Sequence, residues 1–330
     1  MERAVFGTRT GEILVGHGPF TARTDPPGGG VAFYKNDFAL GVDKPWLVPA
    51  RVEVLERPPA PLQPPVEVTW AEPDPTGFTE VFREISNAIA GGSLEKAVPV
   101  VTEKGRGKPS PEQWLARLVG LPTALRPYGW IEEGRGFLGA TPEVLFRYFD
   151  GRIYTMALAG TARHDERMVF AVDEKEIREH EFVAQTLISK LSDLGMVIRR
   201  DRDILDLGRL IHFQTLIKVE LYQYEEIQTL IERLHPTPAL GSLPRTPETL
   251  AQLQEWRERL ECPAGFGAPF GLWREGDFEA LVAIRMVAWD GDEVLLPSGC
   301  GVIQESRLVN EWRELALKRG SVRDLFFGAK

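Results

Sequence analysis

Apolar side chains recur three or four residues apart in several long stretches of the chain, which is the spacing of one helix face. The first stretch consists of Phe78, Val81, Phe82, Ile85, Ala88 and Ile89. Gly91 and Gly92 follow it and favour the end of a helix there. Two further helices are predicted to begin at Ser110-Pro111 and Thr246-Pro247, because a hydroxyl residue followed by proline is typical of a helix start.

The longest helical pattern covers residues 173–194. Its apolar stripe is formed by Ile177, Val183, Ala184, Leu187, Ile188 and Leu191. This stripe leaves Glu176 and Glu179 together near the helix start. A closing helix carries Glu311 and Glu314 with the same spacing, inside the second of two EWRE strings. Residues three apart share one face of a helix, so each of these helices presents a pair of carboxylates.

Strand patterns dominate residues 129–158, where Asp150-Gly151 predicts a hairpin turn. Residues 210–223 read as a strand, and residues 278–299 read as strands folded back around Asp290-Gly291-Asp292. The strands therefore follow one another in hairpins instead of alternating singly with helices. This order predicts an α+β fold with large antiparallel sheets and helices packed on the outside, in preference to a doubly wound parallel fold.

The first 75 residues are interrupted by two segments rich in proline and glycine, at residues 26–30 and 56–65. Short strand-like runs such as GEILVG lie between them. We expect residues 1–75 to be a strand-rich segment of the same domain as residues 76–330, and the second proline-rich stretch to be a linker or an edge segment.

The composition and net charge of the chain limit the kinds of ligand that it is expected to bind. With 330 residues, 43% of them hydrophobic, the chain can bury a large core. Its net charge is −9, and no block of Lys and Arg predicts a nucleic-acid surface. An anionic ligand would therefore need locally placed cations or a bound metal ion.

Cysteine use and hydropathy predict the compartment. Cys262 and Cys300 match neither a disulfide framework nor a zinc spacing, which suits a reducing environment. The first residues lack a signal-peptide pattern, and no run of 18 apolar residues predicts a membrane span. We expect a cytoplasmic protein without membrane contact.

Common catalytic motifs, including the P-loop, HExxH, GxSxG and CxxC, are absent, and the five histidines show no ligand spacing. Taken alone, each ExxE pair is most simply the solvated side of a helix. By the same reasoning, Lys96 is most simply a lysine at the end of a strand, and Glu143 a surface or capping glutamate after Pro142.

Ten short strings nevertheless occur in the order found in one enzyme family. They are GSLEKAV around Lys96, FLGATPEVLFR around Glu143, ALAGTAR around Thr161, KEIREH, HFQT, LHPTPAL, FGAPFG, VAIR, PSGCGV and EWRELALK. From roughly Thr76 to the C-terminus the chain resembles chorismate-utilising enzymes, and it is most similar to their isochorismate synthase branch. The resemblance implies the fold of anthranilate synthase component I, with residues 76–330 as a chorismate-binding catalytic domain.

This resemblance implies an isomerase reaction that converts chorismate to isochorismate. Water adds to one ring carbon while a hydroxyl group leaves another, which requires a base and an acid. By resemblance, Lys96 is the base and Glu143 the acid. A free lysine has a pKa of about 10.4 and a free glutamate one of about 4.3, so both roles require shifted values, and burial shifts both in the useful direction.

The resemblance also assigns a cofactor and a binding site. Glu176, Glu179, Glu311 and Glu314 would hold one Mg²⁺, with Glu179 and Glu314 closest and the other two acting through water. The other EWRE string, with Glu255 and Glu258, is then solvated surface. The residues implied to bind substrate are Gly160, Thr161, His212, Arg285, Gly299, Gly301 and Lys318.

Two of these residues, Arg285 and Lys318, are implied to bind the carboxylates of the substrate, and the two loop glycines to let the backbone approach it. For Glu314 an alternative is a salt bridge to Lys318, one turn further along the helix. Departures from the family pattern are Phe266, where many relatives have tyrosine, Cys300, where alanine is common, and Gly241-Ser242.

The loop that contains Ala159 indicates which branch of the family the chain resembles. Ala159 stands where the aminodeoxychorismate branch has a nucleophilic lysine, and HPTPAL, residues 235–240, resembles the hydroxylating branch more than the aminating one, so no glutaminase subunit is expected. Salicylate synthases, which share Lys96, Glu143 and the metal site and go on to eliminate pyruvate, remain an alternative. A non-catalytic anion- or metal-binding module is a third reading, although binding alone needs neither acid nor base. Menaquinone and siderophore biosynthesis both stay open as the pathway.

Overall fold

The computed structural model describes residues 2–56 and 66–328. Its helices are α1 (Pro75–Ala90), α2 (Pro111–Leu118), α3 (Arg167–Phe170), α4 (Glu174–Leu191), α5 (Ile227–Leu234), α6 (Pro247–Arg259) and α7 (Leu308–Phe327), with a short 3₁₀ helix at His164–Glu166. Its strands are β1 (Arg3–Gly7), β2 (Ile13–Arg23), β3 (Val31–Lys35), β4 (Trp46–Val54), β5 (Val68–Trp70), β6 (Val100–Gly107), β7 (Arg126–Ile131), β8 (Arg135–Thr141), β9 (Val144–Phe149), β10 (Arg152–Arg163), β11 (Gly195–Arg199), β12 (Asp203–Asp206), β13 (Leu210–Leu221), β14 (Pro269–Arg274), β15 (Asp277–Val282), β16 (Met286–Asp290) and β17 (Glu293–Gly299).

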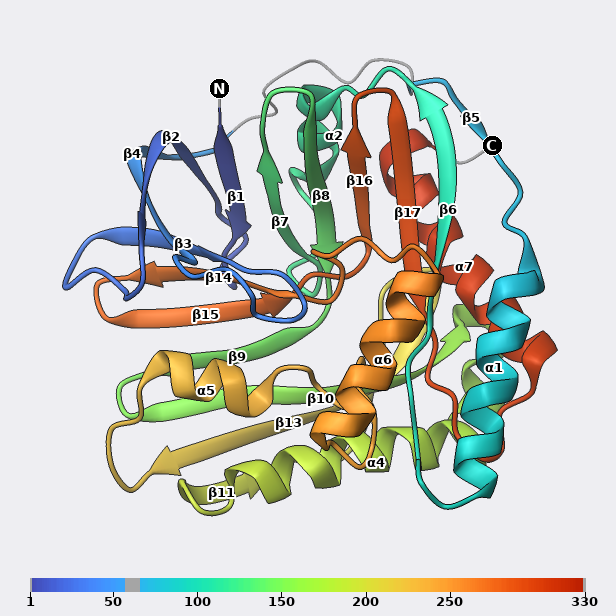
Figure 1. Ribbon diagram of the computed structural model, residues 1–330. Helices are drawn as coiled ribbons and strands as arrows, with labels where there is room; N and C mark the ends of the chain where they lie inside the picture. The colour runs from blue at the N-terminus through green and yellow to red at the C-terminus, as the bar shows by residue number, and fades with distance from the viewer. Residues whose placement is uncertain (1, 57–65, 329–330) are drawn as a thin grey trace.

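Every pairing between these strands is antiparallel, and the strands join into one large sheet. One group of neighbours runs β5-β6-β17-β16-β8-β7-β1-β2, and the other runs β4-β3-β14-β15-β9-β10-β13. The pairing of β2 with β4 connects the two groups. In Figure 1 the strands β6, β17, β16, β8 and β7 stand upright in the upper part of the view. Strands β14, β15, β9, β10 and β13 cross the view below them. The predicted α+β class with large antiparallel sheets is confirmed.

The N-terminal strands lie in the middle of this order. Strand β1 pairs with β7, and β3 pairs with β14, so residues far apart in sequence complete one sheet. The proline-rich stretch predicted to be a linker or edge segment falls at residues 57–65, outside the described residues, apart from Glu56.

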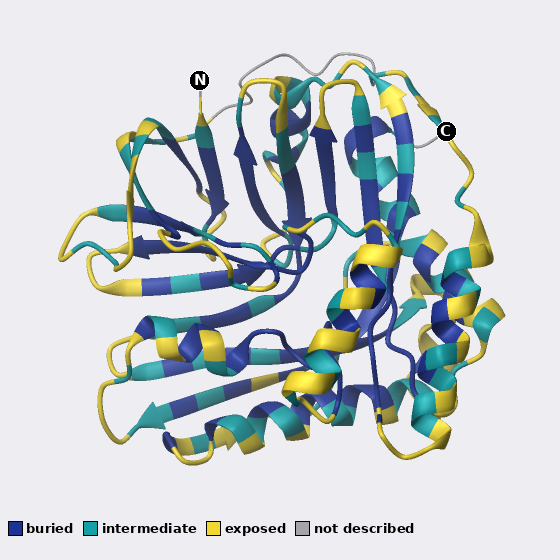
Figure 2. Ribbon diagram, in the orientation of Figure 1, coloured by how far each residue is buried: buried dark blue, intermediate teal, exposed yellow. Residues whose placement is uncertain are grey.

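The helices pack with their apolar faces against the sheet. On α4 the buried residues include Val183, Ala184, Leu187 and Leu191, which belong to the predicted stripe. This helix lies along β10 and β13, and α7 lies against β17. Figure 2 shows most of the strands and the inward helix faces as buried, with the exposed residues on outer helix faces and turns. Within the described ranges, no helix is both long enough and apolar enough to cross a membrane.

The segment around Lys96 is interpreted from sequence as the end of a strand, but in the structure it precedes the strand. The strand β6 begins only at Val100, after Pro99, which has no N–H group to donate to a ladder. Before Pro99 the chain forms two isolated bridges, Lys96 to Leu243 and Ala97 to Val302. These bridges hold Lys96 between the loop after α5 and the loop before α7.

Candidate active site

The predicted site residues converge on one pocket of about 660 Å³. Its lining includes Glu143, Gly160, Thr161, Glu179, His212, Arg285, Gly299, Gly301, Glu314 and Lys318. Strands β10, β13 and β17, helices α4 and α7, and the connections flanking β9 and β16 supply these residues. Glu176 and Glu311 line a neighbouring cavity that shares Thr161 and Glu314 with this pocket.

The carboxyl group of Glu143 is buried, so this residue is not a surface glutamate. It lies between β8 and β9 with 3% of its surface exposed. Its amide N–H donates to Oγ1 of Thr141 at 3.1 Å, and its Oε1 accepts from Oγ1 of Thr237 at 3.0 Å. Burial raises the pKa of Glu143 to about 7, although the hydrogen bond from Thr237 and the nearby Lys96 act in the opposite direction. The group is therefore partly protonated near neutral pH.

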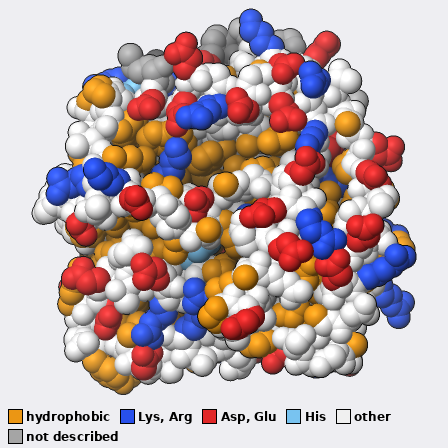
Figure 3. All heavy atoms as spheres, viewed as in Figure 1, with side chains coloured by type: hydrophobic (Ala, Val, Ile, Leu, Met, Phe, Trp, Pro, Cys, Tyr) orange, Lys and Arg blue, Asp and Glu red, His pale blue; other side chains and the backbone are white. Residues whose placement is uncertain are grey.

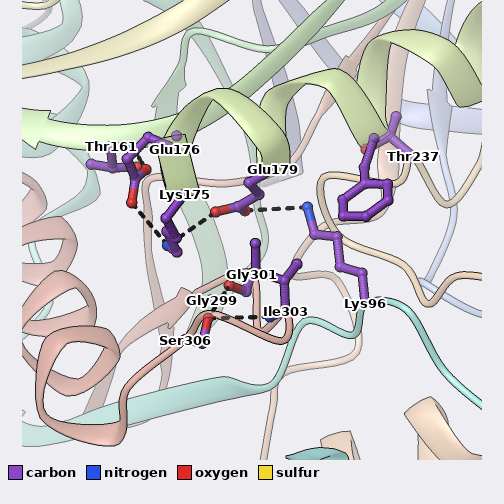
Figure 4. A network of polar contacts seen from close by, with 12 residues as sticks. Lys96, Thr161, Lys175, Glu176, Glu179, Thr237, Gly299, Gly301, Ile303 and Ser306 are labelled. Carbon is purple, nitrogen blue, oxygen red and sulfur yellow. Dashed lines mark hydrogen bonds and ion pairs between the residues drawn. The ribbon is translucent and has the colours of Figure 1, made fainter. Parts of the chain in front are cut away.

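Lys96 is fully buried, which excludes a lysine that extends into solvent from a strand end. Its Nζ lies 3.2 Å from Oε1 of Glu179, as Figure 4 shows. Lys96 is not part of the pocket lining, because the carboxylate of Glu179 lies between them. In this structure Lys96 stands one contact behind the pocket wall, through Glu179.

Helices α4 and α7 bring together the four glutamates predicted to bind metal, and a lysine lies among them. Nζ of Lys175 is 2.9 Å from Oε1 of Glu176, 3.2 Å from Oε2 of Glu179 and 3.3 Å from Oε1 of Glu311. Figure 4 shows Lys175 between Glu176 and Glu179. Glu314 lies on the same turns of α7 as Glu311 and pairs elsewhere.

The carboxyl groups of Glu176, Glu179 and Glu311 differ in the direction of their pKa shifts. Burial, together with neighbouring carboxylates, raises the pKa of Glu176 to about 7 and that of Glu311 to about 8. Burial would also raise the pKa of Glu179, but the ammonium groups of Lys96 and Lys175 outweigh it and lower the value to about 2. Of these three groups, Glu179 is therefore the one that is fully ionised near neutral pH.

The donor chemistry of this cluster fits Mg²⁺, which prefers carboxylate oxygens. Oε2 of Glu311 is buried and has no hydrogen-bond partner, so it is an acceptor without a donor. Across residues 2–56 and 66–328, however, no three His, Cys, Asp or Glu side chains are arranged as a ready metal site. Three of the four carboxylates, those of Glu176, Glu179 and Glu311, instead contact the Lys175 ammonium group at 2.9 to 3.3 Å.

Arg285 is held from two sides. Its Nη1 donates to Oγ of Ser321 at 2.7 Å, and its Nη2 donates to Nε2 of His212 at 3.0 Å. Nδ1 of His212 in turn donates to the carbonyl oxygen of Gly160 at 2.8 Å, which fixes the tautomer with its proton on Nδ1. Burial, followed by the charge of Arg285, lowers the pKa of His212 well below its usual value, so the ring is neutral.

Lys318 forms a salt bridge with Glu314, which was the alternative role considered for this glutamate. Its Nζ lies 2.5 Å from Oε1 of Glu314 and donates to the carbonyl oxygen of Gly299 at 2.9 Å. Lys318 still lines the pocket, so a carboxylate ligand would compete with Glu314 for its ammonium group. Positive and negative side chains are mixed over the face seen in Figure 3. Among the described residues, this face carries no large patch of one charge. Within the pocket lining, the cations that an anionic ligand could contact are Arg285 and Lys318.

Two pocket glycines are needed for close approaches. A Cβ atom on Gly301 would lie 1.9 Å from Oε1 of Glu179, so this glycine makes room for a glutamate as well as bordering the pocket. Gly160 has a φ of +75°, and the next amide, that of Thr161, donates to Oε2 of Glu176 at 2.8 Å. The sequence-based reason for Gly301, approach of the backbone to a ligand, is thus incomplete, because this position also accommodates the Glu179 carboxylate.

Reasoning from sequence alone missed two polar residues. Lys175 and Thr237 lie inside the strings KEIREH and LHPTPAL, but no spacing rule marks either of them as part of a site. The apolar part of the pocket wall consists of Leu158, Ala159, Ala239, Leu240, Phe266 and Ile284. Glu255 and Glu258 of the first EWRE string are exposed on α6, as predicted.

Comparison with known proteins identifies the family of this chain. A sequence model described as chorismate binding enzyme matches residues 45–325, so the chain belongs to the chorismate-binding enzyme family. It is 34% identical over 200 residues to the salicylate biosynthesis isochorismate synthase of Pseudomonas aeruginosa, and 30% identical over 210 residues to isochorismate synthase EntC of Escherichia coli. These alignments cover 57% and 59% of the chain but only 41% and 52% of the relatives. The chain thus spans about half the length of the curated relatives that it matches.

Solved structures show the same fold over nearly the whole chain. MenF, the menaquinone-specific isochorismate synthase from Escherichia coli, has a TM-score of 0.80 at 20% identity, covering 99% of this chain and 89% of that one. A putative 2,3-dihydroxybenzoate-specific isochorismate synthase, DhbC from Bacillus anthracis, has a TM-score of 0.83 at 18% identity, covering 99% and 97%. The resemblance to chorismate-utilising enzymes is therefore confirmed.

Proposed function

We propose that the protein is an isochorismate synthase that converts chorismate to isochorismate and requires Mg²⁺. The observation that carries this proposal is the buried carboxyl group of Glu143, whose pKa of about 7 leaves it able to donate a proton in a pocket that also holds Arg285 and Lys318. Binding alone would need the two cations but not a neutral acid. The names of the relatives, which are isochorismate synthases, support the same reaction.

The reaction balances without an oxidant or a second substrate other than water. Arg285 and Lys318 bind the carboxylates of chorismate. For this step Lys96 has to be neutral and to reach past Glu179, with which it pairs in this structure. It then takes a proton from the attacking water, and Glu143 gives a proton to the leaving hydroxyl group, so one water is consumed and one is released. Glu176, Glu179, Glu311 and Glu314 would hold Mg²⁺, which supplies a hard cation for the substrate carboxylate and offsets the charge of the cluster.

One feature of the pocket argues against the route of the aminodeoxychorismate branch, in which a lysine acts as the nucleophile. Ala159 lines the pocket at that position and offers no nucleophile. We accordingly expect chorismate as the small-molecule partner and no glutaminase subunit. We also propose that residues 1–75 and 76–330 form one domain, which the pairing of β1 with β7 and of β3 with β14 supports.

Incubation with chorismate and Mg²⁺, followed by chromatography, tests the proposal. We expect isochorismate alone, loss of activity with EDTA and recovery with added Mg²⁺. Salicylate with pyruvate would instead identify a salicylate synthase, and absence of turnover would overturn the proposal.

Two variants test the assigned roles. Lys96→Met and Glu143→Gln keep the side-chain volume, and each should lower kcat by roughly 10²- to 10⁴-fold. Glu255→Gln, on the exposed face of α6, serves as the matched control and should keep full activity. Thermal unfolding followed by circular dichroism checks that the variants are folded, and near-normal kcat in either active-site variant would refute the assigned role.

A further inference from the structure

A second buried hydroxyl group, that of Thr237, contacts the carboxyl group of Glu143. Thr237 is 3% exposed, and its Oγ1 donates to Oε1 of Glu143 at 3.0 Å. Thr237 does not line the pocket, whereas Glu143 does. The hydroxyl group therefore approaches Glu143 from the protein side and leaves the pocket side of the carboxyl group free.

Thr237 is held in a rigid turn. Its carbonyl oxygen accepts the N–H groups of Leu240 at 2.9 Å and of Gly241 at 2.7 Å. The turn is tied at its start by His235, whose Nε2 donates to the carbonyl oxygen of Phe38 at 2.7 Å. His235 is neutral, since burial lowers its pKa to about 3. The N-terminal segment that contains Phe38 thus helps to fix the position of Thr237.

We propose that Thr237 is a positioning residue for the acid of this enzyme: it occupies Oε1 of Glu143, so that the transferable proton resides on Oε2. The inference rests on the proposed function and adds to it the group that orients the acid. A hydroxyl group that donates to one carboxyl oxygen leaves only the other oxygen to carry the acidic proton. Thr237 thereby fixes which oxygen can meet the leaving hydroxyl group.

The same hydrogen bond sets the balance between the two forms of Glu143. Burial favours the neutral carboxyl group, and the hydrogen bond from Thr237 favours the ionised one. Lys96 and Lys318 are the charged groups that act on Glu143 in the same sense as Thr237. The other titratable or charged groups that line the pocket are Glu179, His212, Arg285 and Glu314. Loss of the Thr237 donor leaves all of these in place, so the pKa of Glu143 should rise.

The variants Thr237→Val and Thr237→Ser separate positioning from packing. Valine matches the shape of threonine without the donor, and serine keeps the donor. In Thr237→Val we expect kcat to fall roughly tenfold and the alkaline limb of the pH profile to move up by roughly one unit. Thr237→Ser should restore most of both. Thr186→Val is the control, because it removes a comparable threonine bond, to the carbonyl oxygen of Phe182 on α4, away from the pocket.

Infrared spectroscopy supplies a readout that does not depend on turnover. The carboxyl stretch of Glu143, assigned by its loss in Glu143→Gln, is titrated in wild type and in Thr237→Val. A higher midpoint in Thr237→Val supports the inference even if chorismate proves not to be the substrate. An unchanged midpoint and an unmoved pH limb in a folded Thr237→Val protein would overturn it, as would a Thr237→Ser variant that behaves like Thr237→Val.

Discussion

The ammonium group of Lys175 lies 3.3 Å from Oε1 of Glu311, and this ion pair links helix α4 to helix α7. Burial alone would lower the pKa of Lys175, but Glu179 and Glu311 outweigh it and raise the value above that of free lysine. The lysine is therefore firmly charged. It acts as a counter-ion of the acidic cluster.

Replacing Lys175 should strengthen metal binding, because Mg²⁺ would no longer have to displace an ammonium group. For Lys175→Met we expect the Kd for Mg²⁺ to fall roughly tenfold, which corresponds to about 1.4 kcal/mol. We also expect a lower Tm in EDTA, because the glutamates lose their counter-ion. Isothermal titration calorimetry and thermal unfolding without chorismate measure both quantities. Lys44→Met, at an exposed position without a carboxylate contact among the described residues, should change neither. Weaker Mg²⁺ binding in Lys175→Met would contradict the role of Lys175.

The fold was predictable where the pattern is local and periodic. The stripe from Val183 to Leu191 specifies α4, and the Asp150-Gly151 turn specifies the hairpin of β9 and β10, because both signals act over a few residues. The central position of β1 between β2 and β7 depends on its pairing with β7, which places Arg3 opposite Ile131, and no local preference encodes such a distant partner. The long-range sheet order therefore had to come from the structure.

The candidate site was also only partly predictable from the sequence. Motif order indicated Lys96, Glu143 and the four glutamates, but the contacts that control them are tertiary. Neither the donor of Thr237 to Glu143 nor the insertion of Lys175 among the glutamates follows from sequence spacing. The structure also shows that Lys96 is fully buried, whereas a lysine near the end of a strand is usually solvated.

The raised pKa of Glu143 predicts a specific dependence of stability on pH. Because the folded protein favours the neutral carboxyl group, the stability from this residue is fully present below the unfolded pKa of about 4.3. It is lost as pH rises through the folded pKa of about 7. Glutamine does not titrate, so the unfolding free energy of Glu143→Gln relative to wild type should increase by roughly 3 kcal/mol between pH 4 and pH 8.

Urea unfolding at several pH values checks this difference. Glu255→Gln, which removes an exposed carboxylate from α6, is the control and should show no comparable trend. A constant difference between Glu143→Gln and wild type across the range would mean that Glu143 titrates like a free glutamate.

The neutral ring of His212 predicts an effect on substrate binding. His212→Phe keeps an aromatic ring but removes the acceptor for Nη2 of Arg285, so KM for chorismate should rise roughly tenfold with a smaller change in kcat. Because the pKa of His212 lies well below its usual value, wild-type KM should show no histidine transition near pH 6.5. Steady-state kinetics from pH 5.5 to 8 measures both. His17→Phe, on β2 and away from the pocket, is the matched control, and an unaltered KM in His212→Phe would exclude a role for the ring in holding Arg285.

Gly301 predicts how closely the acidic cluster is packed. A methyl group at this position would fall 1.9 Å from Oε1 of Glu179 and 3.0 Å from Cε of Lys96, so one of the two side chains has to move. Since Glu179 is a fully ionised carboxylate of the cluster, its displacement in Gly301→Ala should weaken Mg²⁺ binding roughly tenfold or more and lower the Tm. Gly28→Ala adds the same methyl group where nothing lies within 4 Å and should leave both unchanged. Calorimetric titration of Mg²⁺ into the two variants distinguishes the cases, and equal affinities would show that Gly301 does not determine where the Glu179 carboxylate lies.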